Sequence, residues 1–124
     1  MADHNPFRWV EIYVQDMARA RKFYETVCKL KLEKLPSPEA ELWAFPMAPN
    51  AAGAAGALVK MEGMPSGGSS TIVYFATEDC AVEASRVVAA GGKIHRNKFS
   101  IGEHGFVALV LDTEGNVFGL HSMK

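Results

Sequence analysis

The amino-acid sequence repeats one order of elements, a strand, a helix and three further strands, in its two halves. In the first half, apolar residues alternate with other types over Arg8–Val14, the period of a half-buried strand, and recur at helical spacing over Asp16–Cys28. Three short strand candidates follow, Lys31–Leu35, Glu41–Phe45 and Ala57–Met61. Few folds suit this order, because a sheet in each half must bury one face under its own helix.

The second half restarts this order after a loop at Gly63–Ser70. Thr71–Ala76 predicts a strand and Asp79–Ala90 a helix, and further strands are predicted at Lys93–His95, Phe106–Leu111 and Val117–His121. The helix-capping aspartates, Asp16 and Asp79, lie 63 residues apart, about half of the 124-residue chain, as an internal duplication predicts. We therefore predict an α+β fold in one domain, residues 1–124. Two βαβββ modules, about 7–62 and 70–123, would form a curved mixed sheet around a cavity.

The apolar stripes of the two helices predict which side chains they bury. The stripe of the first helix comprises Met17, Ala20, Phe23, Tyr24 and Val27, and that of the second comprises Cys80, Val82 or Glu83, Val87 and Ala90. Both cysteines, Cys28 and Cys80, lie in apolar-periodic segments, so we expect each to be a small buried side chain.

Charge and hydropathy exclude several classes of partner. Thirteen Lys and Arg against fourteen Asp and Glu give a net charge of −1, which supplies no field to hold nucleic acid or an anionic membrane. A membrane-spanning helix needs about 20 apolar residues, and no apolar run in the sequence comes close to that length. The first residues do not resemble an export signal, so we expect a cytoplasmic protein.

Strand alternation predicts which residues line the cavity. If Val10, Ile12 and Val14 face the helix, then Trp9, Glu11 and Tyr13 face the cavity. In the last strand, Phe118 and Leu120 would pack under the helix, which leaves Val117, Gly119 and His121 on the cavity side. We therefore expect a ligand pocket on the sheet rather than on the helices.

Two motifs carry a resemblance to a known family. The strand ending Val14-Gln15-Asp16-Met17, followed by Ala20 and Phe23-Tyr24, resembles the N-terminal signature of the vicinal oxygen chelate superfamily, which comprises glyoxalase I, bleomycin-resistance proteins and extradiol dioxygenases. The turn Asp112-Thr113-Glu114-Gly115-Asn116 resembles that superfamily's Asp-Pro-Asp-Gly-Asn turn, with Thr113 in place of the proline. The resemblance implies paired βαβββ modules, usually a homodimer, and in the enzymes a divalent metal in the cavity.

The matching positions of this chain do not carry the metal ligands that the resemblance implies. The first-strand position falls on Trp9, we assign its second-module equivalent to Val73, and Gly119 stands where metal-binding relatives carry Glu. On the strand Ala57–Met61, Leu58, Val59 and Lys60 are all poor ligands. Indole, isopropyl and glycine groups cannot coordinate a cation. We therefore predict no metal and no other cofactor.

Two ionisable residues remain on the predicted cavity side, Glu11 and His121. A carboxylate and an imidazole in one pocket could serve as a proton-transfer pair, and these are our candidate catalytic residues. Alternatively, Glu11 pairs with Arg8 or Lys60 and His121 lies at a rim or dimer interface, or the two residues hold a displaced metal. The candidate pocket set is Trp9, Glu11, Tyr13, Trp43, Lys60, Val73, Phe75, Phe99, Gly119 and His121.

The aromatic members of this set, Trp9, Tyr13, Trp43, Phe75 and Phe99, would stack a planar or hydrophobic ligand, with ordinary core packing as the alternative for each. The segment His95–Gly105 is either a lid over the cavity or a solvated connection.

Our preferred function is metal-free sequestration of a small organic molecule by a homodimer, as in the drug-resistance branch of the superfamily. The alternatives are a glyoxalase-like lyase or isomerase using Glu11 and His121, and an interaction module that regulates a partner enzyme.

Overall fold

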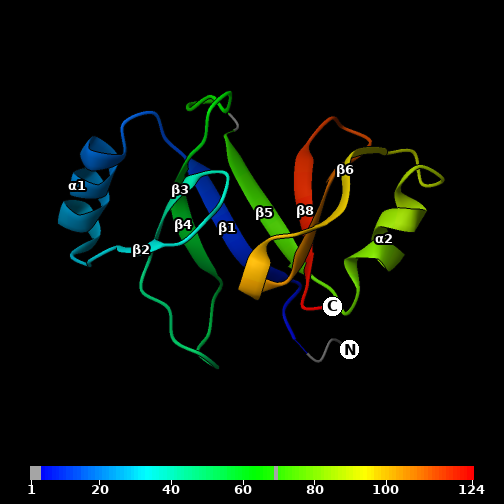
Figure 1. The fold of residues 1–124 in the computed structure, drawn as a ribbon, viewed down its shortest axis with the longest axis horizontal. Helices are drawn as coiled ribbons and strands as arrows, with labels where there is room; N and C mark the ends of the chain where they lie inside the picture. Colours follow the sequence, from blue (N-terminus) through cyan, green and yellow to red (C-terminus); the bar gives the residue numbers. More distant parts are fainter. Residues whose placement is uncertain (1–3, 69) are drawn as a thin grey trace. The chain divides into compact units, whose positions relative to one another are not determined.

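The computed structural model describes residues 4–68 and 70–124, and the chain divides into two compact units (Figure 1). We call Trp9–Thr71 the first module, and Ile72–Lys124 with the N-terminal residues up to Arg8 the second module. Both follow the predicted order of strand, helix and three strands. The elements are β1 (Phe7–Tyr13), α1 (Met17–Cys28), β2 (Glu33–Leu35), β3 (Glu41–Ala44), β4 (Ala55–Lys60), β5 (Thr71–Ala76), α2 (Cys80–Val87), β6 (Lys93–Ser100), the 3₁₀ helix η1 (Gly102–His104), β7 (Phe106–Leu111) and β8 (Val117–Ser122).

In the first module the strand order is β2-β3-β4-β1, with β1 parallel to β4 and the other pairs antiparallel. The helix α1 begins where the sequence predicts, because the Asp16 carboxylate accepts a hydrogen bond from the Arg19 N–H at 3.0 Å. It ends at Cys28, and the capping residue Lys29 takes a left-handed conformation with φ of 51°. Between α1 and the sheet lies a core of Met17, Leu32 and Leu58, which we call the α1 core or α1 cluster. Around these residues pack Ile12, Val14, Ala20, Tyr24, Leu30, Trp43 and Phe45.

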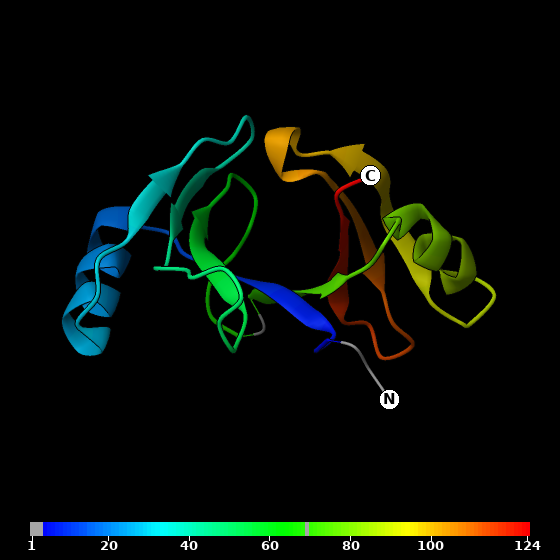
Figure 2. The same ribbon diagram turned by 90° about the horizontal axis from the view of Figure 1, so that it is seen from below.

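In the second module the strand order is β5-β8-β7-β6, with β5 parallel to β8. The Asp79 carboxylate caps α2 by accepting from the Ala81 N–H at 3.0 Å. The helix lies along β6, β7 and β8 (Figure 2). The core of the second module, which we call the α2 cluster, consists of Cys80, Ala84, Ala108, Val110 and Leu120. Around these residues pack Phe75, Val87, Ile94, Phe106 and Phe118. The predicted cavity depends on how the modules are placed and stays a prediction.

The segment that we interpreted as a lid or a solvated connection is mostly a strand. β6 continues to Ser100 and pairs with β7, and η1 follows it. Two register shifts interrupt the pairing, between Ile94 and Arg96 and between Arg96 and Phe99. An edge strand with such irregularities and with charged side chains has no clean apolar alternation, so its length was not visible in the sequence.

Each helix buries a narrower stripe than the sequence predicts. Phe23 and Val27 on α1 are 58% and 63% exposed, and Val82 on α2 is 46% exposed. Cys28 is exposed, so our prediction for it is wrong, whereas Cys80 is buried as expected. Helix α1 packs on the sheet through Met17, Ala20 and Tyr24. The predicted apolar stripe is wider than this contact, so its other members stay exposed.

Within the described residues, none of the helices has the length and apolar character needed to cross a membrane.

Candidate functional site

The residues Trp9, Glu11 and Tyr13 share the face of β1 that α1 leaves uncovered. Ile12 and Val14 belong to the cluster under α1, so the alternating positions between them point the other way. Glu11 lies beside Ala57 of β4, and Tyr13 lies beside Val59. The strand alternation therefore assigned this face correctly.

The Glu11 carboxylate is held by the two aromatic side chains on either side of it. The Trp9 indole Nε1–H donates to Oε2 at 3.2 Å, and the Tyr13 hydroxyl donates to Oε1 at 2.7 Å. Tyr13 is buried and Glu11 is half-buried. A distance of 2.7 Å is that of a well-formed O–H···O hydrogen bond. The arrangement fixes a carboxylate on an otherwise largely apolar strand face.

Lys60, which we had placed in the same pocket, lies elsewhere. It is exposed at the end of β4 and shares the alternation of Leu58, which lies in the α1 core. It lines an open surface groove of about 710 Å³ together with Gln15, Ser37, Pro38, Glu39, Ala40, Glu41, Met61, Glu62 and Gly63. The pocket assignment of Lys60 is therefore wrong, because strand alternation turns its side chain away from the Glu11 face.

On the second module, Gly119 and His121 share the face of β8 opposite α2. Phe118 and Leu120 pack in the α2 cluster, as predicted. His121 lies beside Val107 of β7, and Phe99 of β6 lies beside Val107 in turn. Phe99 therefore does share a face with His121, although it comes from the segment interpreted as a lid.

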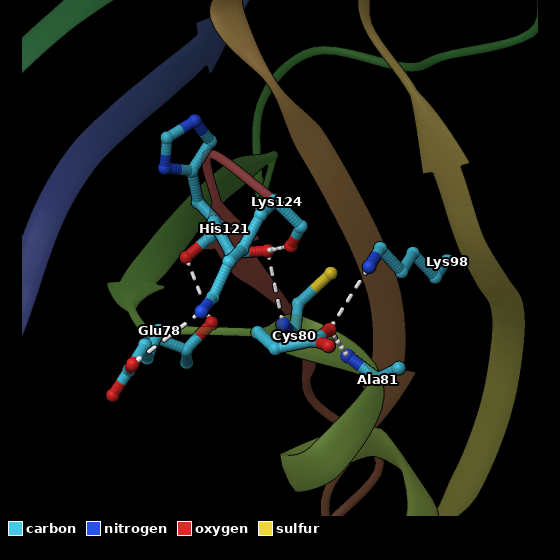
Figure 3. A network of polar contacts seen from close by, with 9 residues as sticks. Glu78, Cys80, Ala81, Lys98, His121 and Lys124 are labelled. Carbon is cyan, nitrogen blue, oxygen red and sulfur yellow. Dashed lines mark hydrogen bonds and ion pairs between the residues drawn. The ribbon is translucent and has the colours of Figure 1, made fainter.

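Within the described part of the chain, the His121 side chain makes one hydrogen bond. Its Nε2 lies 2.7 Å from the carbonyl oxygen of His104 in η1. Its Nδ1 is buried and has no hydrogen-bond partner among the described residues. The ring points away from Cys80 and Ala81 at the start of α2 (Figure 3).

The backbone carbonyl of His121 is held by hydrogen bonds from Thr77. Both the N–H and the hydroxyl of Thr77 donate to the His121 carbonyl at 2.8 Å. The next residue, Ser122, accepts from the Cys80 N–H at 2.9 Å through its hydroxyl oxygen, and this hydroxyl donates to the Lys124 carbonyl at 2.8 Å (Figure 3). Our sequence reasoning missed Thr77 and Ser122, because nothing in a single sequence pairs residues that lie so far apart along the chain.

An ion pair joins the α2 cap to β6. Lys98 Nζ lies 2.9 Å from Asp79 Oδ1 (Figure 3). This hydrogen bond, together with the Ala81 N–H, holds the pKa of the Asp79 carboxyl below its ordinary value.

The Asp112–Asn116 turn has a structural role. Asp112 Oδ1 accepts from the N–H groups of Glu114 and Asn116 at 2.8 and 2.9 Å, and Oδ2 accepts from Asn116 Nδ2 at 3.1 Å. The hydrogen bonds from Asn116 and Glu114 lower the pKa of Asp112. The turn sets the β7–β8 register that aligns Leu109 with Gly119 and Val107 with His121.

The superfamily's usual metal site does not fit these residues. A Cβ atom on Gly119 would overlap the ring of Tyr74, so this position has no room for a carboxylate side chain. Trp9 offers an indole donor, which is already bonded to Glu11. Among residues 4–68 and 70–124, no three His, Cys, Asp or Glu side chains come together as a metal could require.

Val73 is not the second-module equivalent of Trp9. Trp9 lies seven residues before Asp16, and the residue seven before Asp79 is Ile72, not Val73. Val73 shares the alternation of Phe75, which packs in the α2 cluster. The assignment of Val73 to the pocket is therefore wrong, although Ile72 is no better a ligand.

Two further aromatic residues, Trp43 and Phe75, belong to the cores. Trp43 packs in the α1 cluster, with the Arg21 guanidinium 3.5 Å above its ring. Phe75 packs in the α2 cluster, 5.4 Å from the Phe118 ring centre and 5.0 Å from that of Phe7. The core-packing alternative therefore holds for both.

These features define a class of protein. Each of its two βαβββ modules buries one sheet face under a helix and carries an ionisable residue on the other face. A family model, the Glyoxalase/Bleomycin resistance protein/Dioxygenase superfamily, matches residues 7–120. The chain belongs to this superfamily.

Sequence relatives and solved structures agree with this membership. The chain is 28% identical over 117 residues to the "Putative glyoxylase CFP32" of Mycobacterium bovis and of Mycobacterium tuberculosis. The match covers 90% of this chain but 43% of those proteins, so the chain spans less than half of their length.

Among solved structures, the chain resembles a variant of the Streptomyces coelicolor methylmalonyl-CoA epimerase in complex with 2-nitronate-propionyl-CoA, with a TM-score of 0.72, 11% identity and coverage of 95% of this chain and 96% of that chain. For the methylmalonyl-CoA epimerase of M. tuberculosis the TM-score is 0.70, the identity 13% and the coverage 96% and 88%. At this identity the likeness shows the fold alone.

Proposed function

We propose that this chain binds a small organic molecule on the sheet faces that its helices leave uncovered, and that it does so without a resident divalent metal. The observation that carries the proposal is the Glu11 carboxylate, fixed between the Trp9 indole and the Tyr13 hydroxyl. This is a recognition group already held in place, flanked by two flat aromatic surfaces. Such preorganisation favours binding, because little side-chain freedom is lost when a ligand arrives.

Sequestration is the form of this function that the residues favour. Both oxygens of Glu11 already accept hydrogen bonds from neighbouring side chains, so the carboxylate suits a fixed acceptor for a ligand's donor group. Tyr74, next to Gly119, leaves no room for a metal-ligating carboxylate at that position. The homodimer expected from the resemblance is part of the same proposal, and sedimentation equilibrium tests it.

A second candidate is a glyoxalase-like lyase or isomerase that uses Glu11 and His121 for proton transfer. The observation that favours it is the buried Nδ1 of His121, which has no partner among the described residues. The mycobacterial relatives that are described as glyoxylases support the same reaction class.

The two tryptophans allow a direct test of the binding proposal. Trp9 reports on the Glu11 face, whereas Trp43 lies in the α1 core. In a screen of small aromatic compounds against the Trp43→Phe variant, we expect binding to quench Trp9 emission. The matched Trp9→Phe variant should show little response to the same compounds. Equal quenching of both variants would place the ligand elsewhere and contradict the proposal.

Metal analysis and one substitution separate sequestration from turnover. We expect the purified chain, incubated with Zn²⁺, Ni²⁺ or Mn²⁺ and dialysed, to retain no stoichiometric metal. Tight retention of one ion per chain would overturn the metal-free proposal. Glu11→Gln should weaken binding of a quenching compound under sequestration, whereas under the second candidate it should abolish the conversion of that compound.

A further inference from the structure

We propose that His121 is held as the neutral tautomer with its proton on Nε2, and that Nδ1 is the acceptor for a hydroxyl or other neutral donor of the bound molecule. This inference rests on the proposed function for the ligand, but the tautomer is a property of the protein alone.

The proton on Nε2 follows from its partner. The His104 carbonyl oxygen, 2.7 Å away, can only accept, so Nε2 must donate. Because this partner is a backbone group, the tautomer does not depend on which side chain stands at position 104. The double hydrogen bond from Thr77 to the His121 carbonyl fixes the backbone that carries the ring.

The role of Nδ1 follows from its burial. In a ring whose proton is on Nε2, Nδ1 presents a lone pair. This nitrogen is buried without a hydrogen-bond partner among the described residues. The lone pair of Nδ1 is therefore an unsatisfied acceptor, and a donor group that reaches it would satisfy it.

The surroundings narrow the chemistry of that donor. The strand neighbours of His121 are Ala76 on β5 and Val107 on β7, and Phe99 lies beyond Val107. Titratable side chains on neighbouring elements are Tyr74 on β5, beside Gly119, and a pair on η1 in which His104 Nε2 lies 3.8 Å from Glu103 Oε1. The same network includes the exposed ion pair of Glu78 with Lys124, at 3.6 Å (Figure 3). A carboxylate ligand has no proton to donate to Nδ1. The geometry suits an alcohol, phenol or enol on an apolar body.

Nitrogen NMR of the ligand-free chain tests the tautomer. In a long-range proton–nitrogen correlation spectrum of the labelled protein at neutral pH, we expect His121 to show a protonated Nε2 and an unprotonated Nδ1. The His121→Gln variant assigns the signals, and exposed His95 serves as the control for a solvent-accessible ring. A proton on Nδ1, or a fully protonated ring, would overturn the inference.

A pair of matched probes tests the acceptor role. Phenol carries a donor and anisole does not, although their apolar bodies are similar. We expect phenol to shift the Nδ1 resonance of His121 and anisole to leave it unchanged. Equal shifts, or no shift with phenol up to its solubility limit, would overturn the acceptor role. If the NMR spectrum shows the expected tautomer but the chain binds none of the screened compounds, the proposed function is contradicted and the tautomer is confirmed.

Discussion

Gly119 offers the sharpest test of the packing described above. Its backbone does not have the positive φ that favours glycine, so a methyl group there meets a steric cost only. The added Cβ would lie 2.9 Å from Cγ of the Tyr74 ring and nearer still to Cδ2 and Cε2. Tyr74 is itself buried, with 6% of its surface exposed, so the ring cannot move aside freely.

The magnitude follows from two opposing effects. Overpacking a buried site costs about 1–3 kcal/mol. Replacing glycine by alanine restricts the unfolded chain and returns about 0.4–1 kcal/mol. We therefore expect Gly119→Ala to lower the free energy of unfolding by about 1–2 kcal/mol, measured by urea denaturation at neutral pH.

A double-mutant cycle with Tyr74→Leu identifies the cause. With the ring replaced by a smaller side chain, Gly119→Ala should cost clearly less, giving a coupling of about 0.5–3 kcal/mol. An equal cost in both backgrounds, or a Gly119→Ala variant as stable as the parent, would refute the reasoning. Gly119→Glu, which introduces the ligand type found in metal-binding relatives, should be less stable than Gly119→Ala and should retain no Zn²⁺ after dialysis.

Three further predictions use other parts of the structure. Tyr13→Phe removes the hydroxyl that donates to Glu11 and leaves a carboxyl oxygen short of a donor, so it should lower the free energy of unfolding by about 1–3 kcal/mol; a variant as stable as the parent would contradict the bond. Because the pKa of Asp79 is lowered in the folded chain, its stabilising effect is present above the ordinary carboxyl pKa and is lost as the pH falls through the lowered value. Urea titrations should therefore show the free energies of unfolding of Asp79→Asn and the parent converging as the pH falls; a difference that does not change with pH would count against this. Lys98→Met should raise the pKa of Asp79, measured by NMR. The exposed thiol of Cys28 should react with a thiol reagent in the native chain, whereas the buried cysteine should react only after unfolding; loss of the fast phase in Cys28→Ser is the control, and two equal rates would contradict the burial difference.

Local pattern alone was enough to predict the order of elements and the faces of β1 and β8. β5 and β7 occupy the predicted ranges, and α1 and α2 follow the aspartates that cap them. Alternation also put Glu11 and His121 on the faces opposite the helices, because side-chain direction in a strand depends only on position along it.

Tertiary structure decided which apolar side chains are buried and what the polar ones contact. Phe23 and Val27 fit the helical stripe as well as Met17 does, but the sheet under α1 covers only one side of that stripe. Trp43 is as aromatic as Trp9, and only the register of β3 with β4 puts it in the α1 core.

The chemistry of the site depended on tertiary structure in the same way. No local pattern brings the Tyr74 ring against Gly119 or the His104 carbonyl against His121, since these contacts join separate elements of the second module. Alternation along a strand is a property of neighbouring residues, and the sequence alone determines it. The partner of a buried nitrogen or the space beside a glycine depends on strands that meet only in the folded chain, and the tertiary structure alone decides it.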